Sequence, residues 1–244
     1  MPTVLLVRHG RSTANTAGVL AGWTAGVDLD DRGREQAAQL AKRLGDLPLA
    51  AVVSSPLDRC LRTAEAVSTV PGPRRSVRPE VVTDDRLGEC RYGDWTGRAL
   101  ASLGKDPLWK VVQGHPSAAV FPGPDGESLR SMQLRAVDAV RDWDAQVAAA
   151  HGDGALWVAV SHGDVIKSIV ADAVGAHLDS FQRIVIDPCS VTAVRYTQTR
   201  PFLLRCNDTG GELASLVQPR RRRRPGRTPR ASDSDAVVGG STGV

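Results

Sequence analysis

Residues 3–10 read TVLLVRHG, and this stretch decides the fold of the chain. Its first five residues are apolar and rich in β-branched side chains, a pattern typical of a strand that is buried on both faces of a mostly parallel sheet. Arg8, His9 and Gly10 follow directly, at the carboxyl end of the predicted strand. Because ligands of open α/β sheets bind outside the carboxyl ends of the strands, we expect these three residues to lie at a binding site.

Two more buried strands with polar ends are predicted farther along the chain. The strand predicted over residues 50–54 ends at Ser54 and is followed by Ser55-Pro56. The strand predicted over residues 155–160 is followed by Ser161-His162-Gly163. We expect the three junctions to converge on one pocket, since the carboxyl ends of parallel strands meet at one edge of a sheet. Two closing strands are predicted as an antiparallel hairpin over residues 191–196 and 202–205.

Helices are predicted between the strands. The first begins with Asp30 or Asp31 as its cap, and the second begins with Pro56 at its first helical position. A long helix is expected over about residues 129–150, and a last one after Gly163. Strands that alternate with helices predict an α/β fold, a three-layer sandwich in which helices flank a mostly parallel central sheet.

The composition is that of a soluble globular protein, with 41% hydrophobic and 24% charged residues among 244. No apolar run is long enough to cross a bilayer, and the apolar N-terminal stretch is too short for a signal peptide. The four cysteines lack CxxC spacing, and the five histidines lack the spacing of metal ligands. We therefore expect a cytoplasmic protein with reduced cysteines, no membrane contact, no metal and no cofactor.

The basic charge of the chain is concentrated in residues 218–244. This tail holds seven arginines against two aspartates, so the net charge of +4 leaves −1 for residues 1–217. Because the tail has few large apolar side chains, we predict that it is disordered and follows a single folded domain over residues 1–217. A solvated tail is favoured over one that contacts nucleic acid. The sequence leaves the oligomeric state open, a homodimer included.

Four motifs suited to handling phosphate occur in order along the chain. They are LVRHG at residues 6–10, followed by Ser12 and Asn15; SSPLDRCLRTA at 54–64; LGECRYGDWTG at 87–97; and SHG at 161–163. Together they resemble the motifs of the histidine phosphatase superfamily, the phosphoglycerate-mutase-like proteins, over about residues 3–210. The resemblance implies a phosphoglycerate-mutase-like fold, makes residues 1–217 the catalytic domain, and implies an enzyme that forms a phosphohistidine.

The resemblance assigns catalytic roles to residues of all four motifs. His9 is implied as the nucleophile, which requires a neutral imidazole whose other nitrogen is bonded, for example to a backbone carbonyl near Gly10. Arg8, Arg59 and His162 are implied as the groups that bind the phosphoryl oxygens, because charge spreads over three oxygens in the transition state.

Glu89 is implied as the proton donor to the leaving group and as the base for the attacking water. Burial or the phosphate dianion must keep its pKa high despite the nearby cations. The alternative is a loop glutamate paired with Arg91. The Gly126-Glu127-Ser128 stretch signals a helix start and resembles a further family element near the site. The other residues expected to bind the substrate are Gly10, Arg11, Ser12, Asn15, Ala21, Gly22, Arg91, Tyr92 and Gly163, together with Arg8 and Arg59.

The segment between Glu89 and His162 favours a phosphatase over a mutase. It lacks the adjacent arginines with which glycolytic mutases of the family hold a second anionic group. Its apolar residues would either cap the pocket or simply pack together: Trp95, Trp109, Val111, Val112, Ala119, Val120 and Phe121. We therefore expect a metal-independent phosphomonoesterase for a small organic phosphate ester. The alternatives are a mutase, and a phosphate-binding or regulatory protein whose basic tail contacts nucleic acid.

Overall fold

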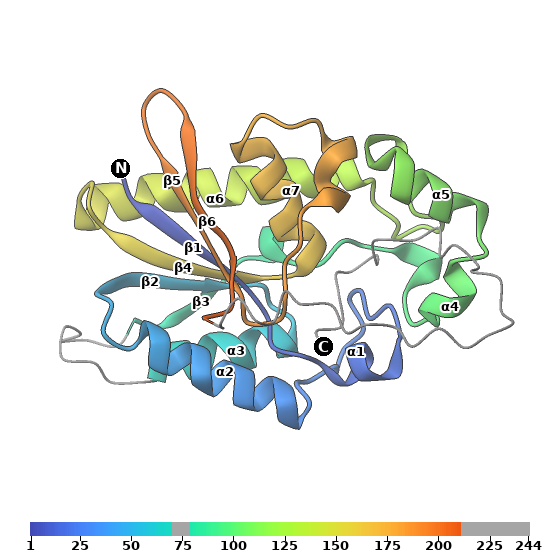
Figure 1. Ribbon diagram of the computed structural model, residues 1–244, viewed down its shortest axis with the longest axis horizontal. Helices are drawn as coiled ribbons and strands as arrows, with labels where there is room; N and C mark the ends of the chain where they lie inside the picture. Colours follow the sequence, from blue (N-terminus) through green and yellow to red (C-terminus); the bar gives the residue numbers. More distant parts are fainter. Residues whose placement is uncertain (70–78, 211–244) are drawn as a thin grey trace, which may run out of the picture.

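The computed structural model of the chain describes residues 1–69 and 79–210 (Figure 1). The predicted tail, residues 218–244, and its boundary with the catalytic domain lie outside the described residues. Among the helices of the two described ranges, none is long and apolar enough to span a membrane.

A mixed, mostly parallel sheet of six strands forms the middle layer, as predicted. The strands are β1 (Thr3–Arg8), β2 (Leu49–Ser54), β3 (Val81–Thr83), β4 (Leu156–Ser161), β5 (Val191–Tyr196) and β6 (Pro201–Asp208). Their order is β3-β2-β4-β1-β5-β6, so β1 and β4 occupy the centre. β1 to β4 run parallel, β5 is antiparallel to β1, and β6 is antiparallel to β5, which confirms the predicted hairpin.

Helices form the two outer layers. They are α1 (Thr13–Ala17), α2 (Asp31–Leu44), α3 (Asp58–Thr69), α4 (Leu100–Leu103), α5 (Pro107–Gly114), α6 (Leu129–His151) and α7 (Gly163–Ala173), with 3-10 turns at Asp85–Leu87, Gly93–Trp95, Pro116–Ala118 and Leu178–Arg183. α2 and α3 lie against one face of the sheet, and α6 and α7 lie against the other (Figure 1). The three-layer α/β sandwich is therefore confirmed.

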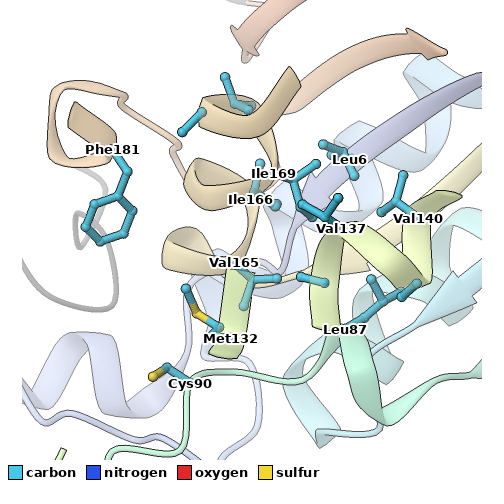
Figure 2. Packing of buried hydrophobic residues seen from close by; sticks show 14 of the residues in the cluster. Leu6, Leu87, Cys90, Met132, Val137, Val140, Val165, Ile166, Ile169 and Phe181 are labelled. Carbon is cyan, nitrogen blue, oxygen red and sulfur yellow. The ribbon is translucent and has the colours of Figure 1, made fainter. Parts of the chain in front are cut away.

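Alternate residues of β1 point to opposite layers, which explains why its sequence is continuously apolar. Val4 and Leu6 pack with buried residues of α6 and α7, whereas Leu5 and Val7 pack with those of α2 and α3. Figure 2 shows the first of these layers around Leu6, with side chains that include Val137, Val140, Ile166 and Ile169. Packing on both faces thus fixes β1 and the residues that follow it.

The start of α3 differs from the prediction that Pro56 is its first residue. Ser55 N–H still bonds to Val160 O of β4 at 2.9 Å, so the chain follows the sheet up to this point. Helical hydrogen bonding begins only at the Leu57 carbonyl, which accepts from Cys60 N–H at 2.8 Å. The prediction of a helix start at Pro56 is therefore wrong by two residues.

Most of the apolar residues between Glu89 and His162 pack the core, whereas Val120 is 61% exposed. Trp95, Val112, Ala119 and Phe121 are at most 2% exposed and belong to the core on the α6 and α7 side. Trp95 also stacks on Trp109, with 6.2 Å between ring centroids. Of the two roles left open by the sequence, internal packing is the correct one for these side chains, and an apolar wall for a substrate is wrong.

Candidate active site

The three polar junctions converge at the carboxyl end of the sheet. His9 follows β1, Arg59 lies in the first turn of α3 beyond β2, and His162 follows β4. The rings of His9 and His162 are 5.2 Å apart between centroids. His9 N–H donates to Ser161 O at 3.0 Å, which ties the end of β1 to the end of β4. Three separate segments therefore build one polar site.

His9 is a buried imidazole whose tautomer is fixed by its neighbour. Its Nδ1 lies 2.7 Å from Gly10 O, and because a carbonyl only accepts, Nδ1 carries the proton. Nε2 accepts a hydrogen bond from Arg59 Nε at 3.3 Å. Burial, followed by the charges of Arg59 and Arg8, lowers the pKa of His9 well below its ordinary value. The imidazole is therefore neutral at pH 7, with its lone pair on Nε2.

Two buried arginines lie beside the histidines. Arg59 is 2% exposed; its Nη2 donates to Gly22 O at 2.9 Å and lies 3.3 Å from His162 Nδ1. Arg8 is fully buried, and its Nη1 donates to Ile186 O at 2.7 Å. Backbone carbonyls thus hold both guanidinium groups in place, and such groups bind the oxygens of a phosphate in fixed geometry.

His162 occupies the N-cap position of α7 and is fully buried. Its Nε2 lies 2.8 Å from Ser55 Oγ and 3.4 Å from Cys60 Sγ. Burial, followed by the charge of Arg59, lowers the pKa of His162 well below its ordinary value. The ring is therefore neutral at pH 7, and since Arg59 donates toward Nδ1, the proton lies on Nε2 and is donated to Ser55.

Side chains from distant segments hold the loop that carries Glu89. The Glu89 carbonyl accepts hydrogen bonds from Trp23 Nε1 at 2.6 Å and from Arg135 Nη2 at 2.9 Å. Arg135 Nη1 donates to the carbonyls of Arg86 and Gly88 at 2.7 and 2.8 Å. One arginine of α6 therefore holds three carbonyl groups of this irregular backbone.

Glu127 supports both Arg135 and the loop. Its Oε2 accepts from Arg135 Nε at 3.0 Å, and its Oε1 accepts from Arg91 N–H at 2.8 Å. The next residue, Ser128, caps α6 by accepting from Ser131 N–H at 2.9 Å. The predicted helix start is therefore confirmed, and it lies beside the candidate site.

The Glu89 carboxyl group is 4% exposed and lies against the histidines. Its Oε2 is 3.7 Å from His162 Nδ1, and its Oε1 accepts from Cys90 N–H at 2.9 Å. Burial, followed by the charge of Asp164, raises the pKa of Glu89 to about 7, although Arg59 acts in the opposite direction. A carboxyl group with this pKa can both donate and accept a proton near neutral pH.

Arg91 and Trp23 border a cavity of about 390 Å³. The Arg91 guanidinium lies 4.0 Å above the centroid of the Trp23 ring. Among the ion pairs of the described residues there is none between Arg91 and Glu89, so the alternative pairing of these two is wrong. The cavity is lined by Trp23, Thr24, Arg91, Gly93, Asp94, Thr96, Pro124 and Asp125.

Three residues expected to bind the substrate secure the backbone after His9. Arg11 Nε bonds to Asp30 Oδ2 at 2.6 Å, and Asp30 is the cap of α2. Ser12 and Asn15 form the reciprocal capping box of α1, with Asn15 N–H donating to Ser12 Oγ at 3.2 Å. These side chains are therefore engaged in local structure.

The other predicted binding residues occupy different places relative to the site. Gly22 reaches it through the carbonyl that receives Arg59, and Ala21 precedes it, half-buried. Gly163 is the first residue of α7. The Tyr92 side chain is buried, and its hydroxyl donates to Asp164 Oδ2 at 3.2 Å. The structure therefore directs the Tyr92 hydroxyl to the protein interior.

Gly10 and Gly33 let α2 approach the loop after β1. A Cβ atom on Gly33 would lie 1.9 Å from Arg11 O, and one on Gly10 would lie 2.6 Å from Gly33 O. From the other side, Thr63 Oγ1 of α3 accepts from Gly10 N–H at 3.1 Å. Two helices therefore clamp the backbone next to His9.

Five residues that shape the site were missed in the sequence. Thr63 lies one helical turn after Arg59, so helical spacing could have found it. Ser55 lies in the same motif, directly after β2. Asp164 directly follows the SHG motif. Trp23 and Arg135 carry no local signal, because only the tertiary fold brings them to the Glu89 loop.

Comparisons with known proteins identify the family of the chain. The family model of the histidine phosphatase superfamily (branch 1) matches residues 4–209. The chain is 30% identical over 221 residues to the probable phosphoglycerate mutase GpmB of Erwinia tasmaniensis, covering 88% of this chain and 95% of that protein. It is 28% identical over 212 residues to phosphoserine phosphatase 1 of Hydrogenobacter thermophilus, covering 86% and 93%.

Among solved structures, YhfR of Bacillus stearothermophilus matches with a TM-score of 0.72 at 28% identity, covering 85% of this chain and 98% of that one. A mycobacterial glucosyl-3-phosphoglycerate phosphatase has a TM-score of 0.71 at 24% identity, a likeness of fold alone, covering 84% and 99%. The relatives are named as mutases and as phosphatases, which supports an enzyme of one of these two kinds. Since the family model spans most of its length, this chain belongs to the histidine phosphatase superfamily.

Proposed function

We propose that the protein is a metal-independent phosphomonoesterase that hydrolyses a small organic phosphate ester through a phosphohistidine at His9. The observation that carries the proposal is the state of His9, a neutral imidazole fixed by Gly10 O with Nε2 beside the Arg59 guanidinium. An unprotonated nitrogen next to a fixed cation suits attack on a phosphate dianion. The similarity to phosphoserine phosphatase 1 supports hydrolysis.

In the first step, His9 Nε2 attacks phosphorus, and the bond from phosphorus to the ester oxygen breaks with its electron pair on oxygen. Glu89 gives its proton to that oxygen, so a neutral alcohol leaves. The proposal assigns the nonbridging oxygens to Arg8, Arg59 and His162. The two arginines supply the positive charge that a metal ion supplies in other phosphatases, and the pKa of Glu89, about 7, supports its role as an acid.

In the second step, the Glu89 carboxylate takes a proton from water, and the water oxygen attacks phosphorus. The phosphorus–nitrogen bond breaks, its electron pair returns to His9 Nε2, and inorganic phosphate leaves. Both residues then have the protonation states with which the cycle began, so ester and water yield alcohol and phosphate.

A mutase is the second candidate, and the similarity to GpmB favours it. A mutase returns the phosphoryl group to another hydroxyl of a substrate that carries a second anionic group. The cavity beside the Glu89 loop offers such a group one cation, Arg91, but also the carboxylates of Asp94 and Asp125. Like-charge contacts with these carboxylates favour hydrolysis of an ester without a second anion.

Glu89→Gln tests the proposal with two esters. An alkyl phosphate needs a proton on its leaving oxygen, so we expect its turnover to fall about 10²–10⁴-fold. A nitrophenyl phosphate leaves unaided, so phosphorylation of His9 should fall far less and the phosphohistidine should accumulate. Quench-flow with ³²P-labelled ester measures both. Glu65→Gln, an exposed glutamate of α3, is the matched control and should behave as wild type.

Two results would contradict this scheme. Equal losses on both esters without trapped intermediate would remove Glu89 as the proton donor, and label on His162 would reverse the assignment of the nucleophile. The mutase candidate is separated by its products. Conversion of 3-phosphoglycerate to its 2-phosphate isomer without release of inorganic phosphate would establish a mutase.

A further inference from the structure

A second buried carboxylate lies behind Glu89. Asp164 is fully buried in the first turn of α7, two positions after His162. Its Oδ1 lies 3.3 Å from Lys167 Nζ, and its Oδ2 accepts from the Tyr92 hydroxyl at 3.2 Å. No step of the proposed mechanism uses this carboxylate, although it lies next to the residues that do.

Two contacts join the first turn of α7 to the Glu89 loop. Glu89 Oε2 lies 3.7 Å from His162 Nδ1. Three positions after Glu89, the Tyr92 hydroxyl donates to Asp164 Oδ2. His162 is the cap of α7 and Asp164 lies in its first turn, and the side chains of both contacts are buried. Glu89 and Asp164 therefore occupy one interface from which water is excluded, where charges interact strongly.

Lys167 holds the charge of Asp164 in place. It is 4% exposed, its Nζ lies 3.1 Å from Gln182 Oε1, and it lies 5.6 Å from the centroid of the Phe181 ring. A buried ion pair rarely stabilises a protein more than apolar residues of the same volume. Stability alone is therefore a weak reason for this pair to lie behind a candidate catalytic acid.

Charged groups from three elements face Glu89. Arg59 of α3 and Arg8 of β1 favour its ionised form, and so does the Cys90 N–H. Asp164 of α7 favours the protonated form, as does burial. The remaining titratable neighbours are His9 and His162, which are neutral at pH 7, and Tyr92, Cys60 and Cys90. Burial raises the pKa of each of the last three above its ordinary value.

We propose that Asp164, held by Lys167 and Tyr92, is a positioning residue that keeps Glu89 protonated while His9 is neutral. The inference rests on the proposed function, in which Glu89 donates a proton. After burial, Asp164 is the largest influence that raises the pKa of Glu89. Without it, only burial would oppose Arg59 and Arg8, and a larger share of Glu89 would be ionised at the pH at which His9 attacks. The ion pair thus lets an acid work beside two arginines.

The pH dependence of kcat/KM for an alkyl phosphate tests the inference. The high-pH limb of the profile, where activity is lost, reports ionisation of Glu89. Asp164→Asn should lower the midpoint of this limb by roughly one pH unit, which equals about 1.4 kcal/mol. Asp172→Asn is the matched control, because it removes a carboxylate from the same helix that pairs with Arg141 at the surface. Its limb should stay in place.

A direct titration separates the inference from the proposed function. The ¹³C carboxyl resonance of Glu89 is identified by its absence in Glu89→Gln, and its midpoint should fall in Asp164→Asn. If the midpoint falls and the rates do not follow, Glu89 is not the proton donor and the proposed function fails. If Glu89→Gln discriminates the two esters but Asp164→Asn leaves limb and midpoint unchanged, the inference alone is overturned.

A lone buried lysine can prevent Asp164→Asn from folding. Asp164→Asn/Lys167→Met removes both charges and keeps the volume, and it should lower the same limb and midpoint. A folded double variant with the wild-type midpoint would overturn the inference as well.

Discussion

His9 and Glu89 are placed by different kinds of structure. His9 continues the central strand β1, and a backbone carbonyl of the next residue fixes its ring. Glu89 lies on an irregular loop whose carbonyls are held by side chains, chiefly Arg135 of α6. The proposed phosphorus-bonding group thus depends on backbone geometry, whereas the proposed proton-handling group depends on distant side chains. Substitutions far from the site should therefore affect proton transfer selectively.

Removal of the backbone-fixed group should have the largest effect. We expect His9→Ala to lower turnover of every ester on the order of 10⁵–10⁶-fold, as for the loss of other enzyme nucleophiles, and to abolish ³²P labelling of the protein. Cys206→Ala, at an exposed position of β6, serves as control. Undiminished labelling of a folded His9→Ala variant would refute the assignment.

The buried carboxyl group should make stability depend on pH. Glu89 has a pKa of about 7 in the fold against an ordinary value of 4.5, so between these values only the unfolded state releases the proton. Wild type should therefore lose about 3 kcal/mol of unfolding free energy relative to Glu89→Gln between pH 4.5 and 8. The lowered pKa values of His9 and His162 change the unfolding free energy below pH 6.5. They do so equally in wild type and Glu89→Gln, so they cancel in the difference between the two proteins. Urea denaturation across this range measures it, and parallel curves would contradict the prediction.

Loss of the side-chain support should have a smaller effect, directed at Glu89. Arg135→Met removes three hydrogen bonds to loop carbonyls and the pair with Glu127, and should lower the unfolding free energy by about 2 kcal/mol. Turnover of an alkyl phosphate should fall by up to about 10²-fold, and that of a nitrophenyl phosphate less. Arg141→Met, on the exposed side of α6, is the control. Equal losses on both esters would show that the loop also positions the phosphate.

Chelation should have no effect. Since the proposed site takes its positive charge from Arg8 and Arg59, activity should persist with saturating chelator and after dialysis. Activity that is lost on chelation and restored by a divalent cation would refute metal independence.

The sequence predicted the His9 side of the molecule better than the Glu89 side. β1 and β4 are continuous apolar runs and α2 has a clear helical period, so their positions and the convergence of His9, Arg59 and His162 followed from local signals. α1, β3, α4 and α5 span three to eight residues, too few for a period to be recognised. The engagement of Ser12, Asn15 and Tyr92 in internal hydrogen bonds, and the support from Arg135, depend on contacts between distant segments. The cytoplasmic location, the disordered tail and the oligomeric state stay predictions.

Gly33, in the first turn of α2, is a position at which the sequence is constrained although it does not line the cavity. Alanine is the most favourable residue inside a helix, yet its methyl group at this position would displace the Arg11 carbonyl and, through the adjacent backbone, His9. The rim residues Thr24, Asp94 and Asp125 can vary with little constraint from packing, because they line open space. We therefore expect substitutions at the rim to change the substrate during evolution. Position 33 must remain glycine, although most helix positions accept a side chain.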